Sequence, residues 1–353
     1  MIHQRIRRPL MADDSNEPTA VMPKPPFAGD LAQAKAQVSE GVLEVPGEWI
    51  LHHRGRLNGA CIAWRLTGPA DAPLVCAMGG IWCDRRLFDP EHAHRGCWSE
   101  VVGPRRPLDS SRFRILSFDY LGGSADTTGP EPGVPFPSIS TYDQADALGR
   151  LLEHLKIRSL GALIGGSYGG MVALAFAERN PEKVASLFIV SAADRPHPMA
   201  IAWHSIQRHM VRFAIDCGRP QEGLMLARAV ALSLYRSSEE FAARFPVTPS
   251  LSGEQFVFPV ERYLFPQGGG AADFRAEAFL CLSESLDLHN VDVGRVFVPT
   301  LAVASREDQL VPLSDVRALV ARMAAANLQE ISSIHGHDAY LREPEQLRGL
   351  LAT

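Results

Sequence analysis

The sequence predicts an α/β protein with a mostly parallel sheet, helices on both faces and an inserted helical lid. Three observations carry this prediction. Short apolar runs alternate with helical patterns, which is typical of a parallel sheet covered on both sides. One apolar run leads into a glycine-flanked serine and then a helix. Strand signals vanish between residues 194 and 295, although predicted strands flank that stretch.

The core strands are predicted from apolar runs bounded by glycine and proline. Gly-Pro and Asp-Ala-Pro breaks separate the first three runs, and helical stretches separate the later ones. Parallel neighbours require such long crossovers, so the later strands are expected to be parallel. The predicted strands are residues 49–53, 60–67, 74–78, 114–118, 160–164, 184–191, 299–304 and 329–334.

The stretch 194–295 is expected to be a lid. Its helices are predicted at 199–215, 221–235, 239–244 and 273–286. Ser237 and Glu240 have the spacing of a capping box, which indicates ordered structure rather than a linker. Ligands of open α/β folds bind at the carboxyl edge of the sheet, where this insertion should lie.

The predicted organisation has four parts. Residues 46–193 and 296–353 form the two parts of the core, and 194–295 form the lid between them. Residues 1–45 mix proline and charged residues without a sustained period, so we expect a flexible leader.

Composition narrows the function classes. The chain has 353 residues, of which 46% are hydrophobic, and a net charge of -5 with both signs dispersed. Neither nucleic acid nor a membrane is an expected partner, and no run of about 18 apolar residues is present. The 6 cysteines form no C-x-x-C pair, so we expect reduced thiols in a cytoplasmic protein. No residues have metal-ligand spacing, and we expect no metal.

The segment Gly165–Gly170 reads as a nucleophile elbow. It places Ser167 between an apolar run and the helical pattern of 171–179. A sharp strand-to-helix turn strains the serine backbone and tolerates only small neighbours, while it exposes the hydroxyl at a helix N-terminus. A glycine-rich phosphate turn is the alternative, but no Lys-Ser/Thr follows it.

A serine nucleophile needs a base and an orienting acid, which follow the serine in this order in such folds. Asp308 lies in the loop after the strand 299–304, with Glu307 as a rival, and either could be a solvated loop charge. His337 follows the last predicted strand and is preferred over His335. Ser167, His337 and Asp308 are therefore the predicted catalytic triad.

The oxyanion of a tetrahedral intermediate requires two backbone N–H groups. Tyr168, directly after the serine, is expected to supply the first. Met78 or Gly79, in the glycine turn after the strand 74–78, is expected to supply the second, unless this is an ordinary turn.

Together these pieces resemble the homoserine O-acyltransferases of the α/β-hydrolase superfamily, from about residue 60 to residue 347. The elbow, Asp308 and the tripeptide Gly336-His337-Asp338 carry the resemblance in combination. The other matching segments are 77–80, 119–123, 127–130, 142–148, 191–193, 202–203, 207–208, 226–228 and 282–289.

The resemblance implies an acyl-CoA co-substrate, no bound cofactor, L-homoserine as acceptor, a role in methionine biosynthesis and a homodimer. It implies that Arg228 and Asp338 bind the acceptor zwitterion. The residues 224–234 are apolar apart from Arg228 and Ser233, which independently predicts a buried guanidinium in need of a carboxylate. A structural salt bridge of Arg228, or a helix cap by Asp338, is the alternative.

The acyl donor is predicted to be succinyl-CoA rather than acetyl-CoA. Asp119, the segment 282–289 and the Ser-Tyr-Gly elbow are more similar to a succinyltransferase branch. Asp119 and Asp126 depart from the family pattern, since many members have asparagine and glycine at these positions. Serine as the acceptor, and a hydrolase with the same triad, remain open alternatives.

Overall fold

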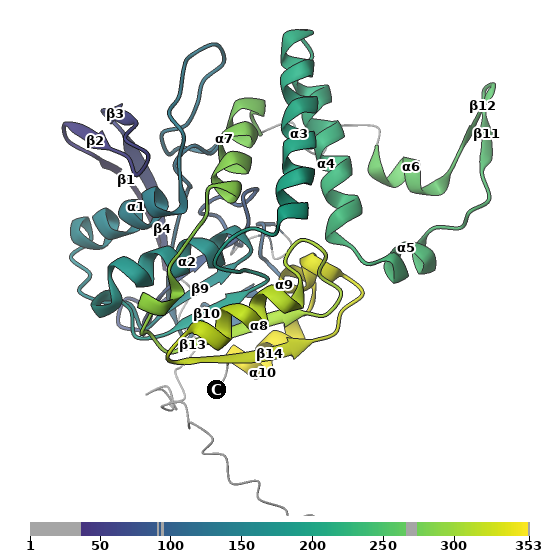
Figure 1. Ribbon diagram of the computed structural model, residues 1–353. Helices are drawn as coiled ribbons and strands as arrows, with labels where there is room; N and C mark the ends of the chain where they lie inside the picture. Colours follow the sequence, from purple (N-terminus) through teal and green to yellow (C-terminus); the bar gives the residue numbers. More distant parts are fainter. Residues whose placement is uncertain (1–36, 90–91, 93–94, 266–273, 352–353) are drawn as a thin grey trace, which may run out of the picture.

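An eight-stranded, mostly parallel sheet forms the centre of the part of the chain that the structure describes. The computed structural model describes residues 37–89, 92, 95–265 and 274–351. The strand order is β1-β4-β8-β5-β9-β10-β13-β14, and the neighbours from β8 to β14 are parallel (Figure 1). The strands are β1 (Val38–Glu44), β4 (Cys61–Thr67), β5 (Leu74–Met78), β8 (Arg114–Phe118), β9 (Ala162–Gly166), β10 (Leu187–Val190), β13 (Thr300–Ser305) and β14 (Ala326–Ile331). The predicted fold class is confirmed.

The edge strand β1 corrects the predicted leader, because residues 38–44 pair antiparallel with β4. None of the side chains of β1 is buried, so the strand lacks the apolar alternation that marks a core strand. The rest of the predicted leader, residues 1–36, lies outside the described residues. The last strand, β14, ends at Ile331, three residues before the predicted end, and the chain then turns toward the site.

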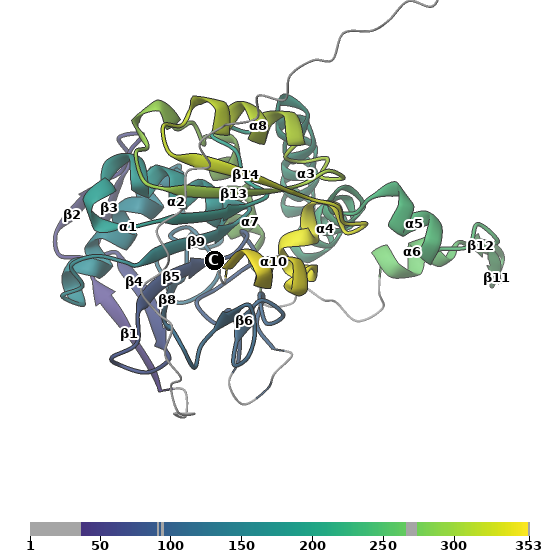
Figure 2. The ribbon, with the colours of Figure 1, turned by 90° about the horizontal axis from the view of Figure 1, so that it is seen from below.

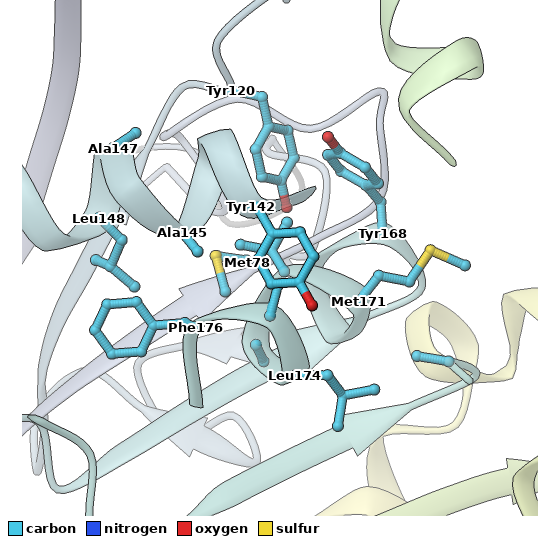
Figure 3. Close-up of a cluster of buried hydrophobic side chains, with 14 of the residues drawn as sticks. Met78, Tyr120, Tyr142, Ala145, Ala147, Leu148, Tyr168, Met171, Leu174 and Phe176 are labelled. Atoms are coloured by element: carbon cyan, nitrogen blue, oxygen red, sulfur yellow. The ribbon is translucent and has the colours of Figure 1, made fainter. Parts of the chain in front are cut away.

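Alternate residues of the central strands feed two cores, one on each face of the sheet. Leu163 and Ile189 belong to the first core, whereas Ile164 and Val190 belong to the second. The first core is covered by α1 (Thr141–His154), α2 (Tyr168–Arg179) and α8 (Leu313–Arg322). Figure 3 shows part of it, where side chains of α1 and α2 meet above the sheet. The second core includes residues of α9 (Ala339–Arg342) and α10 (Pro344–Leu351).

The segment between β10 and β13 is mainly helical. Helices α3 (Pro198–Asp216), α4 (Pro220–Tyr235) and α7 (Ala276–Asp287) pack on one another and rise from the sheet (Figure 1). Beyond them, α5 (Ser238–Arg244), α6 (Pro259–Leu264) and the hairpin β11–β12 (Ser250–Ser252, Gln255–Val257) extend away from the sheet in both views (Figure 2). The expectation that this segment lacks strands was wrong, because three-residue exposed strands give no apolar pattern.

The remaining short elements lie before α1 or join the core elements. The β2–β3 and β6–β7 pairs each form a separate two-stranded sheet. Three 3₁₀ turns cover Pro181–Lys183, Val293–Arg295 and Gly336–Asp338. The strands of the pairs are Glu48–Ile50, Arg56–Asn58, Val102–Gly103 and Leu108–Asp109.

A disulfide joins Cys83 to Cys97 and corrects the expectation that the cysteines are reduced. The 14-residue separation hid this pair in the sequence, because only the packing of the loop after β5 brings the two thiols together. Cys61, Cys76, Cys217 and Cys281 are free thiols.

Candidate active site

The turn from β9 to α2 holds Ser167 in a left-handed backbone conformation, with φ of 53°. Glycine is required on both sides of this turn. A Cβ on Gly165 would collide with the backbone of Gly169, and a Cβ on Gly169 would collide with the carbonyl oxygen of Met78. The close approach of three backbone segments therefore fixes the strained serine, as expected for a nucleophile elbow.

Ser167, His337 and Asp308 form one continuous hydrogen-bonded chain. His337 Nε2 lies 2.9 Å from Ser167 Oγ, and His337 Nδ1 lies 2.8 Å from Asp308 Oδ2. The other oxygen of Asp308 accepts hydrogen bonds from the backbone N–H groups of Leu310 and Val311, both at 2.9 Å. Since these bonds fix the carboxylate, Nδ1 of His337 carries its proton and Nε2 is free to accept the serine proton.

The two rival residues have structural partners instead. Glu307 accepts hydrogen bonds from Ser332 Oγ at 2.6 Å and from the Ser333 N–H at 2.8 Å. His335 Nδ1 lies 3.5 Å from Glu240 and 3.2 Å from Arg236. The geometry thus brings together the preferred acid and the preferred histidine of the sequence prediction.

The electrostatics of the site favour the protonated form of His337. Burial lowers the pKa of His337, but the carboxylates of Asp308 and Asp338 outweigh this effect, and the net pKa is raised above the ordinary value of 6.5. A general base must be neutral, so the raised pKa moves the loss of activity on acidification to higher pH.

We expect kcat/KM of the enzyme to fall as the pH drops through an apparent pKa above 6.5, the ordinary histidine value. Asp338→Asn should move this apparent pKa downward, because one of the two carboxylates that raise it is removed. The measurement is the pH profile of kcat/KM for the step in which Ser167 is the nucleophile. An unchanged profile in Asp338→Asn would show that Asp338 does not act on the histidine.

The loop after β5 forms part of the wall of the cavity around Ser167. Met78 ends the strand, and the Gly79 carbonyl accepts hydrogen bonds from Tyr120 Oη at 2.7 Å and from the Gly169 N–H at 3.0 Å. Gly80 is the residue of this turn that lines the cavity around Ser167. Met78 and Gly79, the residues predicted to complete the oxyanion hole, directly precede Gly80 in this turn.

Tyr168 begins α2, so its N–H is among the first-turn amides that a helix leaves free. Its side chain is completely buried and makes hydrogen bonds to Ser285 at 2.7 Å and Gln144 at 3.2 Å. The phenol anchors the start of the helix to α1 and α7, which holds the neighbouring Ser167 in place.

Arg228 and Asp338 have different surroundings. Arg228 is half-buried rather than buried, and its guanidinium lies over the ring of Trp82, 5.5 Å from the centroid. Among the described residues no carboxylate is within ion-pair distance of it. Asp338 is buried and pairs with Arg236 at 3.0 Å. The side chain of Asp338 makes no helix cap, so this alternative is ruled out.

Arg236 joins the helical segment to the loop that carries His337, here called the histidine loop. The sequence pattern did not predict this role. Its guanidinium contacts Asp338 at 3.0 Å and Glu240 at 3.1 Å and is itself buried. Ser237 adds hydrogen bonds from its N–H and Oγ to the Ile334 carbonyl, at 3.1 and 2.6 Å. We call Arg236, Glu240 and Asp338 the latch. In the sequence, the latch is indicated by Arg236, which directly precedes the capping box of Ser237 and Glu240.

The unusual residues Asp119 and Asp126 both serve Arg85. Asp119 and Arg85 are buried and form an ion pair, and Asp126 binds the same guanidinium. Neither aspartate lines the cavity around Ser167. Both aspartates therefore pair with the guanidinium of Arg85, and neither contacts the cavity directly.

This constellation, on this sheet topology, defines an enzyme of the α/β-hydrolase class. The sequence profile of the alpha/beta hydrolase fold matches residues 98–344. Among solved structures, a homoserine O-acetyltransferase from Bacillus anthracis has a TM-score of 0.79 at 17% identity, covering 91% of this chain and 98% of its own. The acetyl esterase MekB has a TM-score of 0.73 at 17% identity, with coverages of 89% and 97%. These likenesses concern the fold alone.

Curated relatives define the family more narrowly. The chain is 36% identical to a homoserine O-succinyltransferase of Xanthomonas campestris pv. campestris, over 99% of this chain and 95% of the relative. It is 36% identical to a homoserine O-acetyltransferase of Thermus thermophilus, over 84% of this chain and 82% of the relative. The chain belongs to the homoserine O-acyltransferase family, which confirms the resemblance, and both acyl types occur among its relatives. In the described residues, none of the helices is long and apolar enough to span a bilayer.

Proposed function

We propose that the protein transfers a succinyl group from succinyl-CoA to the hydroxyl of L-homoserine through a covalent ester on Ser167. The observation that carries this proposal is the hydrogen-bonded chain Ser167–His337–Asp308 in a cavity lined by Trp82, over whose ring the Arg228 guanidinium lies. The relative matched over 99% of this chain is a succinyltransferase, which supports the choice of acyl group.

In the first half-reaction, Ser167 Oγ attacks the thioester carbonyl while His337 Nε2 takes its proton. The oxyanion is stabilised by backbone N–H groups, of which Tyr168 at the start of α2 supplies one and the turn Met78–Gly80 supplies the other. The C–S bond then breaks, and His337 gives its proton to the departing CoA thiolate. Ser167 is left as an acyl ester and His337 is neutral again.

In the second half-reaction, the homoserine hydroxyl attacks the ester carbonyl while the same Nε2 accepts its proton. The bond between the acyl carbon and Ser167 Oγ breaks, and the serine oxygen recovers the proton. Asp308 keeps the imidazole oriented throughout and stabilises its charged form. The O-acylhomoserine then leaves the site as the product that enters methionine biosynthesis.

We further propose that the reaction takes place in the cytoplasm and that the enzyme is a homodimer.

Transfer rather than hydrolysis is favoured by the charges beside the triad. A zwitterionic acceptor requires a cation for its carboxylate and an anion for its ammonium group. Arg228 has no carboxylate partner among the described side chains, and Asp338, which follows His337 directly, also forms the ion pair with Arg236. A hydrolase for simple esters has no use for such a pair, because water carries no charge.

Arg228→Ala is expected to raise the KM for L-homoserine by about 10- to 100-fold, the usual cost of losing a charge-assisted hydrogen bond. Thioester cleavage without acceptor should change less than about threefold, since Arg228 does not line the cavity around Ser167. Separate assays of the two half-reactions make this comparison. Equal damage to both steps would give Arg228 a structural role.

The direct test of the proposed function is release of free thiol from succinyl-CoA and from acetyl-CoA, each with and without L-homoserine. We expect release from succinyl-CoA that depends on homoserine, with O-succinylhomoserine identified by mass. L-serine in place of homoserine tests the other acceptor. Release that homoserine does not accelerate, with only free acid as product, would make the protein a hydrolase.

A further inference from the structure

The wall of the active-site cavity formed by the β10–α3 loop carries a cation that the proposed mechanism does not use. Ser167 and His337 line this cavity together with Arg195 and His197 of that loop. Most of the lining is apolar. Among the described residues of the lining, Arg195 is the only arginine or lysine, and Asp315 is the only carboxylic acid.

The charge of Arg195 is largely unengaged. Its nearest carboxylate is Asp194, at 3.8 Å, which is too long for a hydrogen bond. Asp194 is buried and already pairs with Arg322 at 2.6 Å. The side chain of Arg195 is 67% exposed and its ion pair with Asp194 is long, so it can reorient toward a ligand at little cost.

Two further basic groups near this wall, His204 and Arg208, share one carboxylate. Both bind Asp287, each at 2.7 Å.

His197 is the N-cap of α3, and its Nδ1 accepts a hydrogen bond from the Met199 N–H at 3.2 Å. The ring therefore carries its proton on Nε2, which can donate to an anion. The start of the 19-residue helix α3 adds partial positive charge at the same place.

From these observations we propose that Arg195, assisted by His197, binds the distal carboxylate of the succinyl group. The inference rests on the proposed function and adds the residue that selects the acyl group. An acetyl group has no charge to place at this wall, whereas a succinyl group brings a carboxylate into a mostly apolar cavity that also contains Asp315. Such a charge requires a cation nearby. The phosphates of CoA offer the same anionic chemistry, so the test must separate the two sources.

The kinetic test compares Arg195→Ala with wild type on two thioesters. We expect kcat/KM for thiol release from succinyl-CoA to fall about 10- to 100-fold, because a charge-assisted contact is lost. The value for acetyl-CoA should change less than about threefold. Asp315→Asn should have the opposite sign and increase kcat/KM for succinyl-CoA, since it removes the opposing charge. Equal losses on both thioesters would assign Arg195 to the phosphates, and no loss on either would remove the subsite.

Arg322→Ala is the matched control. Arg322 also forms an ion pair with Asp194, but it does not line the cavity. We expect it to leave the ratio of succinyl-CoA to acetyl-CoA activity unchanged. A shift in this ratio equal to that of Arg195→Ala would attribute the effect to the loop rather than to a contact with the acyl group.

A binding measurement separates failure of this inference from failure of the proposed function. Succinyl-CoA, acetyl-CoA and CoA are titrated into Ser167→Ala and into the double variant Ser167→Ala/Arg195→Ala by calorimetry. Tighter binding of succinyl-CoA than of acetyl-CoA, lost in the double variant, supports the subsite even if homoserine is not the acceptor. Equal affinities for the two thioesters in Ser167→Ala would overturn it, whatever the acceptor.

Discussion

Ser167→Ala is expected to abolish acyl transfer, with a loss of about 10⁴-fold or more in kcat, because removal of a nucleophile leaves only the binding and oxyanion contributions. The only hydrogen bond of Ser167 Oγ in the described chain is to His337, at 2.9 Å. The measurement is homoserine-dependent thiol release from the acyl-CoA donor.

The fold of Ser167→Ala should remain intact, which makes the loss interpretable. One hydrogen bond is removed, and the left-handed backbone at this residue is equally strained for serine and alanine. We expect the free energy of unfolding in urea to change by less than about 1 kcal/mol. Turnover comparable to wild type in a folded variant would contradict the nucleophile assignment.

Arg236→Ala should have the second largest effect, because it breaks the latch between the helical segment and the histidine loop. Its side chain is 7% exposed and bridges Asp338 and Glu240. Removal of Arg236 leaves the buried Asp338 carboxylate without its cation, which costs about 3–5 kcal/mol, whereas Glu240 keeps its contact with Arg244. Burial already raises the pKa of Asp338, and Arg236 opposes this. Without Arg236 the pKa of Asp338 rises further, so Asp338 loses its charge more readily.

Both half-reactions should suffer in Arg236→Ala, in contrast to Arg228→Ala, because His337 is displaced together with its loop. A shift of about 1 Å in a catalytic group can cost about 100-fold in rate. Urea unfolding and thiol release measure the two effects, and Arg236→Lys should restore part of each.

Arg244→Ala is the control for the latch. Arg244 contacts the same Glu240 at 3.4 Å but is about half exposed, so its loss should cost less than about 1 kcal/mol. Equal effects of Arg236→Ala and Arg244→Ala would show that the latch does not hold the histidine loop.

The sequence predicted those parts of the fold and site that local pattern determines. The strands at 74–78 and 114–118 lie where the apolar runs predicted them, since buried parallel strands are apolar along their whole length. Ser167, Asp308 and His337 were found because each follows a core strand, and parallel strands bring their carboxyl ends to one edge.

The missed features depend on tertiary packing. β1 is an edge strand without buried side chains, and the Cys83–Cys97 bond depends on how a long loop folds. The partner of Asp338 was missed because Arg236 is about a hundred residues away in the sequence and lies in another element. Arg228 was expected to be buried, but it is half-buried, with its guanidinium over the ring of Trp82. Neighbouring residues do not reveal which charges meet.

The proposed mechanism depends on a covalent acyl ester on Ser167, which mass spectrometry detects. The protein is mixed with succinyl-CoA in the absence of acceptor, quenched in acid and digested. We expect the peptide that contains Ser167 to carry the added mass of one succinyl group. When L-homoserine is added before the quench, this added mass should disappear and O-succinylhomoserine should form in equal amount. Product formation without any acylated peptide, or acylation at a residue other than Ser167, would contradict the proposed mechanism.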